Sequence, residues 1–562
     1  MENLRKSVLS LSLSIISLFG MTSCSRKPGI SSKETPEPSS EKNSDQKTSN
    51  SEKPLTYSHE LKDQVKEWVR KSNAKFSVEY YTASAVYCSK PTHASQQSLT
   101  LYAPKEYFNS DGTLNPNGTL NGFTAKSAPI IYWNSHGSYI GQAPFALVGN
   151  STRATQNGWV AELLKKGFVI CMVGERGKQS KNEQGEVIGR GLVAISDLKA
   201  GVRFLRHNKA VLPGNVERII SVGTSSGGSM SALLGTSGNV HHYDDLLQEM
   251  GAVMDERDDV YATQAYCPIT DLDHADYAYE WLYHTDNAAM TDFEKALSQK
   301  MVLKYASYVN SLNLTDGDVS LRLSEDGRKE GTYFTYLEKK YEEAFSDYAE
   351  NFLSDYCKIA TNARNGASDA DDLDWIDYDP QTGESHLVTV EGYDNPIDSM
   401  IKTGFVHRMK TCVPVFDRKA MIGSDNEIFG KQNTKPNSED SVRHFNPEIA
   451  DMIQDLEKDY PEEYGKYYQD YYSDSHDEEV MYWTKYINAT TYLTEDDSST
   501  ISPHFRICMG VEDTDTSCLV SSTLDLLLKK KGIDSTFSLL WGWRHNDVDT
   551  PHGLYDFVMS IL

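Results

Sequence analysis

Short apolar runs alternate with amphipathic stretches in two separate parts of the chain. Residues 129–133 and 169–173 are continuous apolar runs, which is typical of strands buried on both faces of a sheet. Residues 98–102 alternate in polarity, and residues 218–222 form a further strand-like run. Helical spacing is found around these runs, at residues 61–69, 196–207 and 229–234. Strands that alternate with helices predict a mainly parallel sheet covered by helices, which is an α/β fold.

The pattern changes between residues 271 and 500. This stretch is rich in tyrosine and charged residues, and its periodicity predicts amphipathic helices at 333–352 and 451–472. The α/β alternation then resumes, with a strand, a helix, a strand and a last helix predicted at 504–509, 519–530, 535–541 and 555–562. We therefore predict a large, mostly helical lid inserted into one α/β domain.

The first residues have the pattern of an exported protein. Two basic residues precede an apolar run at 9–19, which has the length of a signal peptide and is too short to span a bilayer. Small residues then precede Cys24, which resembles a bacterial lipobox although Met21 is an imperfect match. The resemblance implies lipid attachment to Cys24 and a protein anchored to the cell membrane outside the cytoplasm. Ordinary secretion with cleavage nearby is the alternative.

These patterns divide the chain into five predicted segments. They are a lipoprotein signal peptide (1–23), a disordered polar tether (24–55), the first part of the core (56–270), the lid insertion (271–500) and the last part of the core (501–562).

The composition narrows the choice of partners. The 562 residues include 81 acidic and 55 basic side chains, for a net charge of −26. Because such a surface repels nucleic acid and anionic membranes, we expect no nucleic-acid partner and membrane contact only through the lipid anchor. The cysteines besides Cys24 are scattered and include no Cys-x-x-Cys pair, so we predict no disulfide scaffold, no metal site and no cofactor.

A nucleophile motif follows the strand predicted at 218–222. Residues 223–227 are Gly-Thr-Ser-Ser-Gly, and a helix follows them. G-x-S-x-G between a strand and a helix is the nucleophile elbow of the α/β-hydrolase fold, and it predicts Ser225 as the nucleophile. An oxyanion hole needs two N–H donors. We expect one from Ser226 and the other from Gly137 or Ser138, in a His-Gly loop after the strand at 129–133.

A serine nucleophile needs a base and an acid, which follow it along the chain in this fold. The acid belongs in the loop after the strand at 504–509, where Glu512, Asp513 and Asp515 compete, and we choose Asp513. The base belongs after the last strand. His545 has that position, and His552 is its rival.

With these residues identified, the sequence resembles the bacterial tannases and tannase-like esterases. The similar pieces are the elbow at 222–228 with the segment 232–239 behind it, the acidic segment 513–516, and Trp541-x-x-x-His545. In that family the serine, the first aspartate and the histidine form the catalytic triad. The resemblance therefore implies the triad Ser225, Asp513 and His545, and it favours His545 over His552.

The resemblance also implies a binding site for phenolic hydroxyls. The family holds the gallate hydroxyls with a lysine, an acid and the second aspartate of the acidic pair, which match Lys410, Asp425 and Asp515. Carboxylates and an ammonium suit phenols, whose hydroxyls both donate and accept. The family normally has glutamate at position 425, so the shorter Asp425 leaves open gallate or a related phenolic acid. The alternative is that Lys410 and Asp425 form an ordinary ion pair of the lid.

The sequence thus predicts a serine carboxylesterase that hydrolyses gallate or related phenolic-acid esters, with a small aromatic ester as its substrate. A generic acetyl or carbohydrate esterase of the same fold is the main alternative. The lack of a propeller-like strand repeat before residue 223 argues against a serine peptidase. The complete set of Ser225, Asp513 and His545 argues against a non-catalytic surface lipoprotein.

Overall fold

The structure, a computed structural model, describes most of the chain from residue 56 onwards. The described residues are 56–134, 136–145, 154–283, 290–351, 375–379, 381–382, 384–402, 414–417, 425–435, 442, 444–513, 515–545, 548–549 and 553–562. Cys24, Lys410 and His552 lie outside them, as do the predicted signal peptide and tether. In the described part of the chain, no helix combines the length and apolar character that a bilayer span requires.

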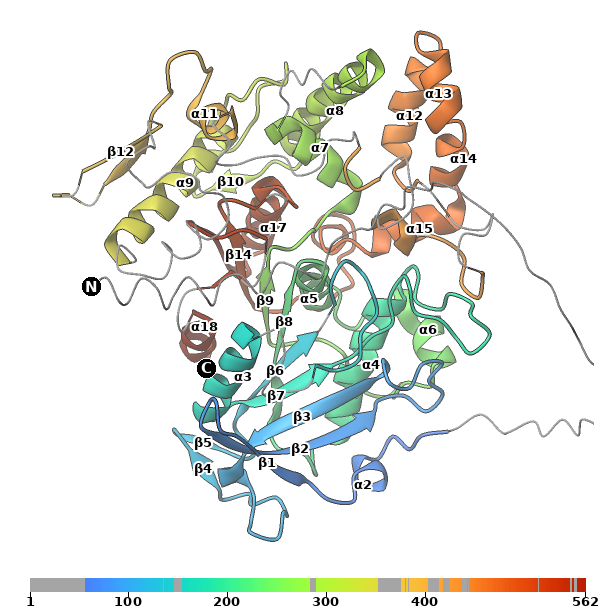
Figure 1. The fold of residues 1–562 in the computed structure, drawn as a ribbon, viewed down its shortest axis with the longest axis vertical. Coiled ribbons are helices and arrows are strands. Elements are labelled where there is room, and N and C mark those ends of the chain that lie inside the picture. The colour runs from blue at the N-terminus through green and yellow to red at the C-terminus, as the bar shows by residue number, and fades with distance from the viewer. Residues whose placement is uncertain are drawn as a thin grey trace, which may run out of the picture. The chain divides into compact units, whose positions relative to one another are not determined.

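A nine-stranded sheet forms the centre of the described chain (Figure 1). Its strands, in spatial order, are β1 (Val69–Asn73), β2 (Val78–Val86), β3 (Ser98–Pro104), β7 (Val169–Val173), β6 (Pro129–Asn134), β8 (Asn215–Thr224), β9 (Ala262–Tyr266), β14 (His504–Gly510) and β15 (Asp534–Leu540). The pairs from β7 to β15 are parallel, whereas β1, β2 and β3 are antiparallel. The predicted mainly parallel α/β sheet is therefore confirmed.

Burial explains which segments became central strands. Every residue of β6, β7 and β9 is buried, as the continuous apolar runs predict for strands covered on both faces. The expected helix at 61–69 is instead the short α2 (Leu61–Gln64), followed by β1. Of the residues in α2 only Leu61 is buried, so a longer helix there would have had little apolar surface to cover.

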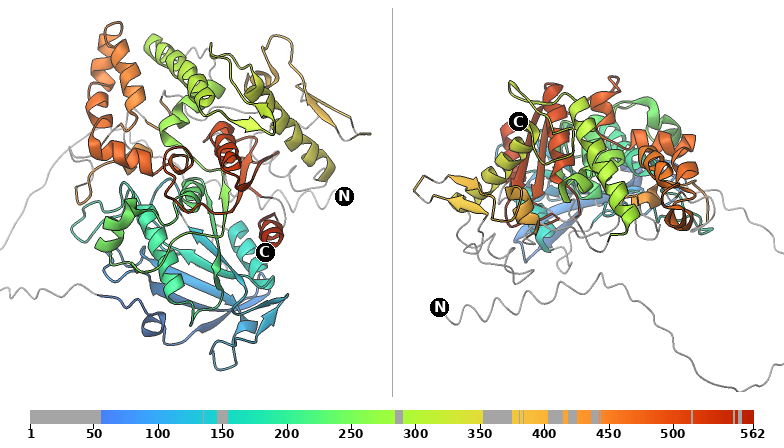
Figure 2. Two further views of the ribbon diagram at one scale, coloured as in Figure 1. Left: turned by 180° about the vertical axis from the view of Figure 1, so that it is seen from behind. Right: turned by 90° about the horizontal axis from the view of Figure 1, so that it is seen from above.

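Among the described residues, the helices that flank the sheet include α3 (Ala154–Lys165), α4 (Val193–His207), α5 (Ser226–Thr236), α17 (Cys518–Lys530) and α18 (Gly553–Ile561). Helices α3 and α18 lie side by side in the views of Figures 1 and 2. Helix α4 packs against α5, the helix that begins directly after the predicted nucleophile.

The inserted segment leaves the sheet after β9 and returns at β14, and these two strands pair directly with each other. Its described residues form the helices α7 (Leu272–Tyr283), α8 (Asp292–Ser311), α9 (Thr332–Asn351), α11 (Pro396–Lys402), α12 (Pro447–Leu456), α13 (Pro461–Tyr467), α14 (Tyr471–Ser475), α15 (Glu478–Tyr486) and α16 (Thr491–Thr494). Where one helix is predicted at 451–472, the structure has parts of three. Pro461 begins α13, because proline cannot continue a helix that precedes it.

Two buried carboxylates hold distant parts of the insertion together. Asp276 of α7 accepts hydrogen bonds from the N–H groups of Val415 and Phe416, at 2.7 and 2.6 Å. Asp417 in turn accepts from the N–H of Phe445 at 3.0 Å, shortly before α12. Both carboxylates belong to fully buried residues, so these contacts replace the water that the backbone groups would otherwise bind.

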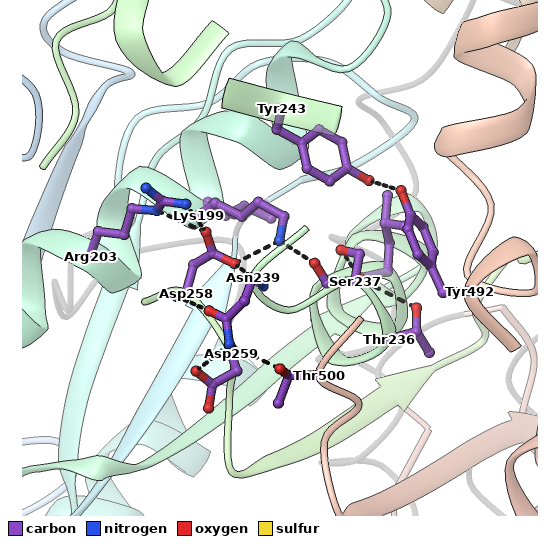
Figure 3. Close-up of polar contacts among 12 residues, drawn as sticks. Lys199, Arg203, Thr236, Ser237, Asn239, Tyr243, Asp258, Asp259, Tyr492 and Thr500 are labelled. Carbon is purple, nitrogen blue, oxygen red and sulfur yellow. Dashed lines mark hydrogen bonds and ion pairs between the residues drawn. The ribbon is translucent and has the colours of Figure 1, made fainter. Parts of the chain in front are cut away.

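A buried ion cluster ties α4 to the end of α5 (Figure 3). Lys199 Nζ lies 2.8 Å from Asp258 Oδ1, and Arg203 Nε donates to Asp258 Oδ2 at 2.8 Å. Lys199 also donates to the carbonyl of Ser237, the residue after α5, at 2.5 Å. Lys199 and Asp258 are fully buried. The charge of each therefore offsets the cost of removing the other charge from water.

We expect Lys199→Met to destabilise the protein by about 3 kcal/mol or more, because it leaves Asp258 a buried carboxylate with one cation fewer. Urea unfolding measures the change. The matched control is Lys340→Met, which breaks the partly exposed Lys340–Glu343 pair and should cost less than about 1 kcal/mol. Equal effects of the two substitutions would contradict a structural role for the buried cluster.

Candidate active site

The turn from β8 into α5 places Ser225 in a strained backbone conformation. Its φ is 62° and its ψ is −126°, a backbone conformation that residues other than glycine rarely adopt. The N–H of Ser225 donates to the carbonyl of Tyr266 at the end of β9, at 2.9 Å. Strain of this kind persists only where surrounding contacts hold it, and it is concentrated at functional sites.

Two glycines make this turn possible. A Cβ on Gly223 would lie 2.3 Å from the carbonyl oxygen of Gly227. A Cβ on Gly227 would lie 2.4 Å from Asn134 Oδ1 and 2.8 Å from the carbonyl oxygen of His136. The elbow and the His-Gly loop therefore approach each other too closely for any larger residue at position 227.

The structure brings the three residues predicted as a triad into contact. His545 Nε2 lies 2.7 Å from Ser225 Oγ, and His545 Nδ1 lies 2.9 Å from Asp513 Oδ2. Asp513 Oδ1 also accepts from the N–H groups of Asp515 and Thr516, at 2.8 and 3.1 Å. Asp513 is buried, while the His545 side chain remains 15% exposed. The imidazole can therefore take the proton of Ser225 while Asp513 holds the other ring nitrogen.

The two loops that contain the predicted acid and the predicted base are hydrogen-bonded to each other. The N–H of Glu512 donates to the carbonyl of Trp543 at 3.0 Å, and Arg544 Nε donates to Glu512 Oε2 at 3.3 Å. Of the three acids that compete for the triad position, it is Asp513 that bonds the imidazole, while Glu512 turns toward Arg544. The rival His552 lies outside the described residues.

The predicted oxyanion loop lies against the start of α5. Asn134 Nδ2 donates to the carbonyl of Gly227 at 3.0 Å, and the N–H of Tyr139 donates to Ser226 Oγ at 3.0 Å. Sequence reasoning did not foresee this second role of Ser226, and no motif marks it. Because the Tyr139 N–H is thereby used, Gly137 and Ser138 stay the candidates for the second donor. Ser226 is the first residue of α5, where helical N–H groups lack an acceptor within the helix.

His136 is buried at the centre of this loop. Neither ring nitrogen has a hydrogen-bond partner among the residues that the structure describes, and the ring packs edge-on against Tyr139, with 5.6 Å between ring centroids. Burial, aided by the charge of Lys178, lowers the pKa of His136 to about 3. The ring is therefore neutral at physiological pH, which fits a residue that shapes the loop.

The residues predicted to bind the phenolic ring are only partly within the described chain. Asp425 begins a short 3₁₀ helix, η4 (Asp425–Ile428), and is half-buried. Burial and the charge of Asp425 both raise the pKa of Tyr139, which places this acid in the surroundings of the oxyanion loop. Asp515 is half-buried and bonds Asp513 through its N–H. Lys410 lies outside the described residues.

Two clusters have donor sets that a metal ion could use, within the part of the chain that the structure describes. One is Asp271, Asp273 and His274, where the carboxylates already accept hydrogen bonds from neighbouring hydroxyl and amide groups. The other is Cys267 with Asp513 and His545. No role in this cluster is predicted for Cys267 from the sequence. Its position directly after a central strand was the available signal.

Comparisons with known proteins agree with this geometry. The BD-FAE family model matches residues 145–315. The native tannin acyl hydrolase of Lactobacillus plantarum is 26% identical, with a TM-score of 0.71 over 88% of this chain and 97% of that one. Its complex with ethyl gallate is 27% identical, with a TM-score of 0.70 over 88% and 96% of the two chains. Fusobacterium nucleatum tannase is 27% identical, with a TM-score of 0.69 over 88% and 98%. No functionally curated protein matches.

The fold is that of the α/β hydrolases, and the chain is similar to bacterial tannases over most of its length. The likeness and the contact of Ser225 with His545 identify the chain as a carboxylic ester hydrolase.

The depressed pKa of His136 predicts acid sensitivity. Between pH 6.5 and about pH 3 the unfolded chain binds a proton at this ring that the folded chain does not, so stability falls as the pH is lowered through this range. We expect His136→Phe to weaken this dependence, measured as the change in urea midpoint between about pH 7 and about pH 4.5. An unaltered dependence in His136→Phe would refute the assignment.

Proposed function

We propose that this protein is a serine esterase that hydrolyses esters of gallate or a related phenolic acid through an acyl-enzyme. The observation that carries the proposal is the position of His545, 2.7 Å from Ser225 Oγ and 2.9 Å from Asp513 Oδ2. The choice of a phenolic acid is supported by similar proteins, which have been solved with ethyl gallate and with 3,4-dihydroxybenzoate.

In the first step, Ser225 attacks the ester carbonyl while His545 Nε2 takes its proton. Asp513 holds the imidazole through Nδ1 and stabilises the imidazolium that forms. The N–H of Ser226 and that of Gly137 or Ser138 bind the oxyanion. His545 then returns the proton to the leaving alcohol. Water attacks the acyl-enzyme with His545 again as base, which releases the acid and restores Ser225.

Lys410, Asp425 and Asp515 are proposed to bind the hydroxyls of the acyl ring. Asp515 follows the triad acid by two residues and bonds it, so its carboxylate belongs to the same loop as the reacting centre. Besides burial, the charge of Asp425 contributes to the raised pKa of Tyr139, which contacts the proposed oxyanion loop. The ring hydroxyls of a phenolic acid can donate hydrogen bonds to the carboxylates of Asp425 and Asp515. The ammonium of Lys410 offsets the negative charge of these two carboxylates.

We also propose that the enzyme acts outside the cytoplasm, held to the cell membrane by lipid on Cys24. This rests on the signal-like apolar run at 9–19 and on the lipobox-like residues before Cys24. A polar tether at 24–55 would let the enzyme reach dissolved esters at a distance from the membrane.

Ser225→Ala should lower kcat for ester hydrolysis by about 10⁴-fold or more, because the remaining groups only bind and polarise the substrate. Release of acid from methyl gallate measures the rate. The control is Ser473→Ala, at an exposed residue, which should behave as wild type. Activity at the wild-type level in Ser225→Ala would refute the mechanism.

Lys410→Ala should lower kcat/KM for methyl gallate by about 10–100-fold, the value of one charged hydrogen bond. Hydrolysis of p-nitrophenyl acetate should change little, because that ester has no phenolic acyl group. The matched control is Lys431→Ala, at an exposed residue of the same inserted segment. If the wild type cleaves p-nitrophenyl acetate but neither methyl gallate nor methyl ferulate, the phenolic specificity is wrong and a generic esterase remains.

A further inference from the structure

A thiol lies beside the acid and the base of the candidate triad. Cys267 follows β9, the strand between β8, which leads into Ser225, and β14, which leads toward Asp513. Its N–H donates to the carbonyl of Cys508 at 2.8 Å, and its φ of 44° is unusual for a side-chain-bearing residue. It is fully buried and is not part of a disulfide. The backbone of Cys267 is therefore fixed against β14, the strand that leads toward Asp513.

The donor atoms at this point lie close together. Cys267 Sγ, a carboxylate oxygen of Asp513 and a ring nitrogen of His545 all lie within 4.8 Å of one another. Thiolate, carboxylate and imidazole are the ligands that zinc prefers in proteins. In a tetrahedral zinc site such donors lie about 3.4–3.6 Å apart, so side-chain shifts of roughly 1 Å would complete the arrangement.

We propose that Cys267, Asp513 and His545 bind a thiophilic divalent cation such as Zn²⁺ or Cd²⁺, and that the bound cation switches the esterase off. The inhibitory part rests on the proposed role of His545 as the base. The cluster of Asp271, Asp273 and His274 is the weaker candidate for a thiophilic cation, because it has no sulfur ligand.

The chemistry of inhibition follows from which ring nitrogen faces the cluster. Nδ1 of His545 faces Asp513, and Nε2 faces Ser225. A cation bound to Nδ1 displaces the proton from that atom, and the neutral ring then carries its proton on Nε2. The Cys267 thiol releases one proton to solvent on ligation. Since a protonated Nε2 cannot accept the proton of Ser225, nucleophilic attack stops without any contact between the cation and Ser225.

A small cation can reach this site although Cys267 is buried. The His545 side chain is 15% exposed and Ser225 is half-buried, so the route used by substrate leads to the ring. Inhibition should therefore be reversible and relieved by a chelator.

The first experiment titrates Zn²⁺ into the wild type, Cys267→Ser and Cys267→Ala, and compares each with its own metal-free rate of ester hydrolysis. Loss of the thiolate should raise the inhibitory Zn²⁺ concentration by at least about tenfold, and EDTA should restore wild-type activity. The control is Cys171→Ser, at a buried thiol in β7, which should stay as sensitive as wild type. Equal sensitivity of wild type and both Cys267 variants would overturn the proposal.

The second experiment does not depend on turnover. Cd²⁺ added to Ser225→Ala should produce the ultraviolet charge-transfer band of a cadmium–thiolate bond, and the double variant Ser225→Ala/Cys267→Ser should lose one equivalent of it. If that difference is absent while the wild type hydrolyses esters, the cation site is wrong and the proposed function stands. If the band is present but the wild type hydrolyses no ester, the proposed function fails and the cation site stands.

Discussion

The strained turn at Ser225 is the constraint on which the rest of the site depends. A residue with a side chain is held at a φ of 62° because its N–H bonds the carbonyl of Tyr266 on one side. On the other side, Gly223 lies so close to the backbone of Gly227, and Gly227 so close to Asn134, that neither position has room for a Cβ. The same close approach brings the His-Gly loop against α5. The proposed nucleophile and the proposed oxyanion donors are therefore positioned by one packing arrangement.

The sheet then decides which residues can meet this turn. β8, β9 and β14 are consecutive parallel strands, and β15 follows them, so their carboxyl ends lie along one edge. Ser225, Cys267, Asp513 and His545 each follow one of these four strands. A parallel sheet thus gathers residues from distant parts of the sequence. The long insertion does not disturb this, because it leaves and returns between two strands that pair directly.

Much of this could be predicted from the sequence because it depends on local patterns. The continuous apolar runs mark β6 and β7, and the elbow motif needs only a strand, two glycines and a helix around Ser225. What could not be predicted depends on contacts between distant segments. No periodicity shows that Cys267 lies beside Asp513 and His545, or that Ser226 Oγ accepts from Tyr139. Pro461 is a signal that the segment 451–472 does not form one helix. The helical spacing of its apolar residues, taken alone, predicts a single continuous helix.

Helix α7 connects the inserted segment to the loop that contains Asp513. At its end, the hydroxyl of Tyr283 donates to the carbonyl of Asp513 at 3.1 Å. In its middle, Asp276 accepts hydrogen bonds from the N–H groups of Val415 and Phe416. These contacts are buried, where breaking a hydrogen bond leaves an unsatisfied group that costs about 1–3 kcal/mol. A displacement of α7 would therefore act on the proposed triad acid and on the inserted segment together. The insertion is thus part of the structure that holds Asp513 in place rather than a cover over a site that is complete without it.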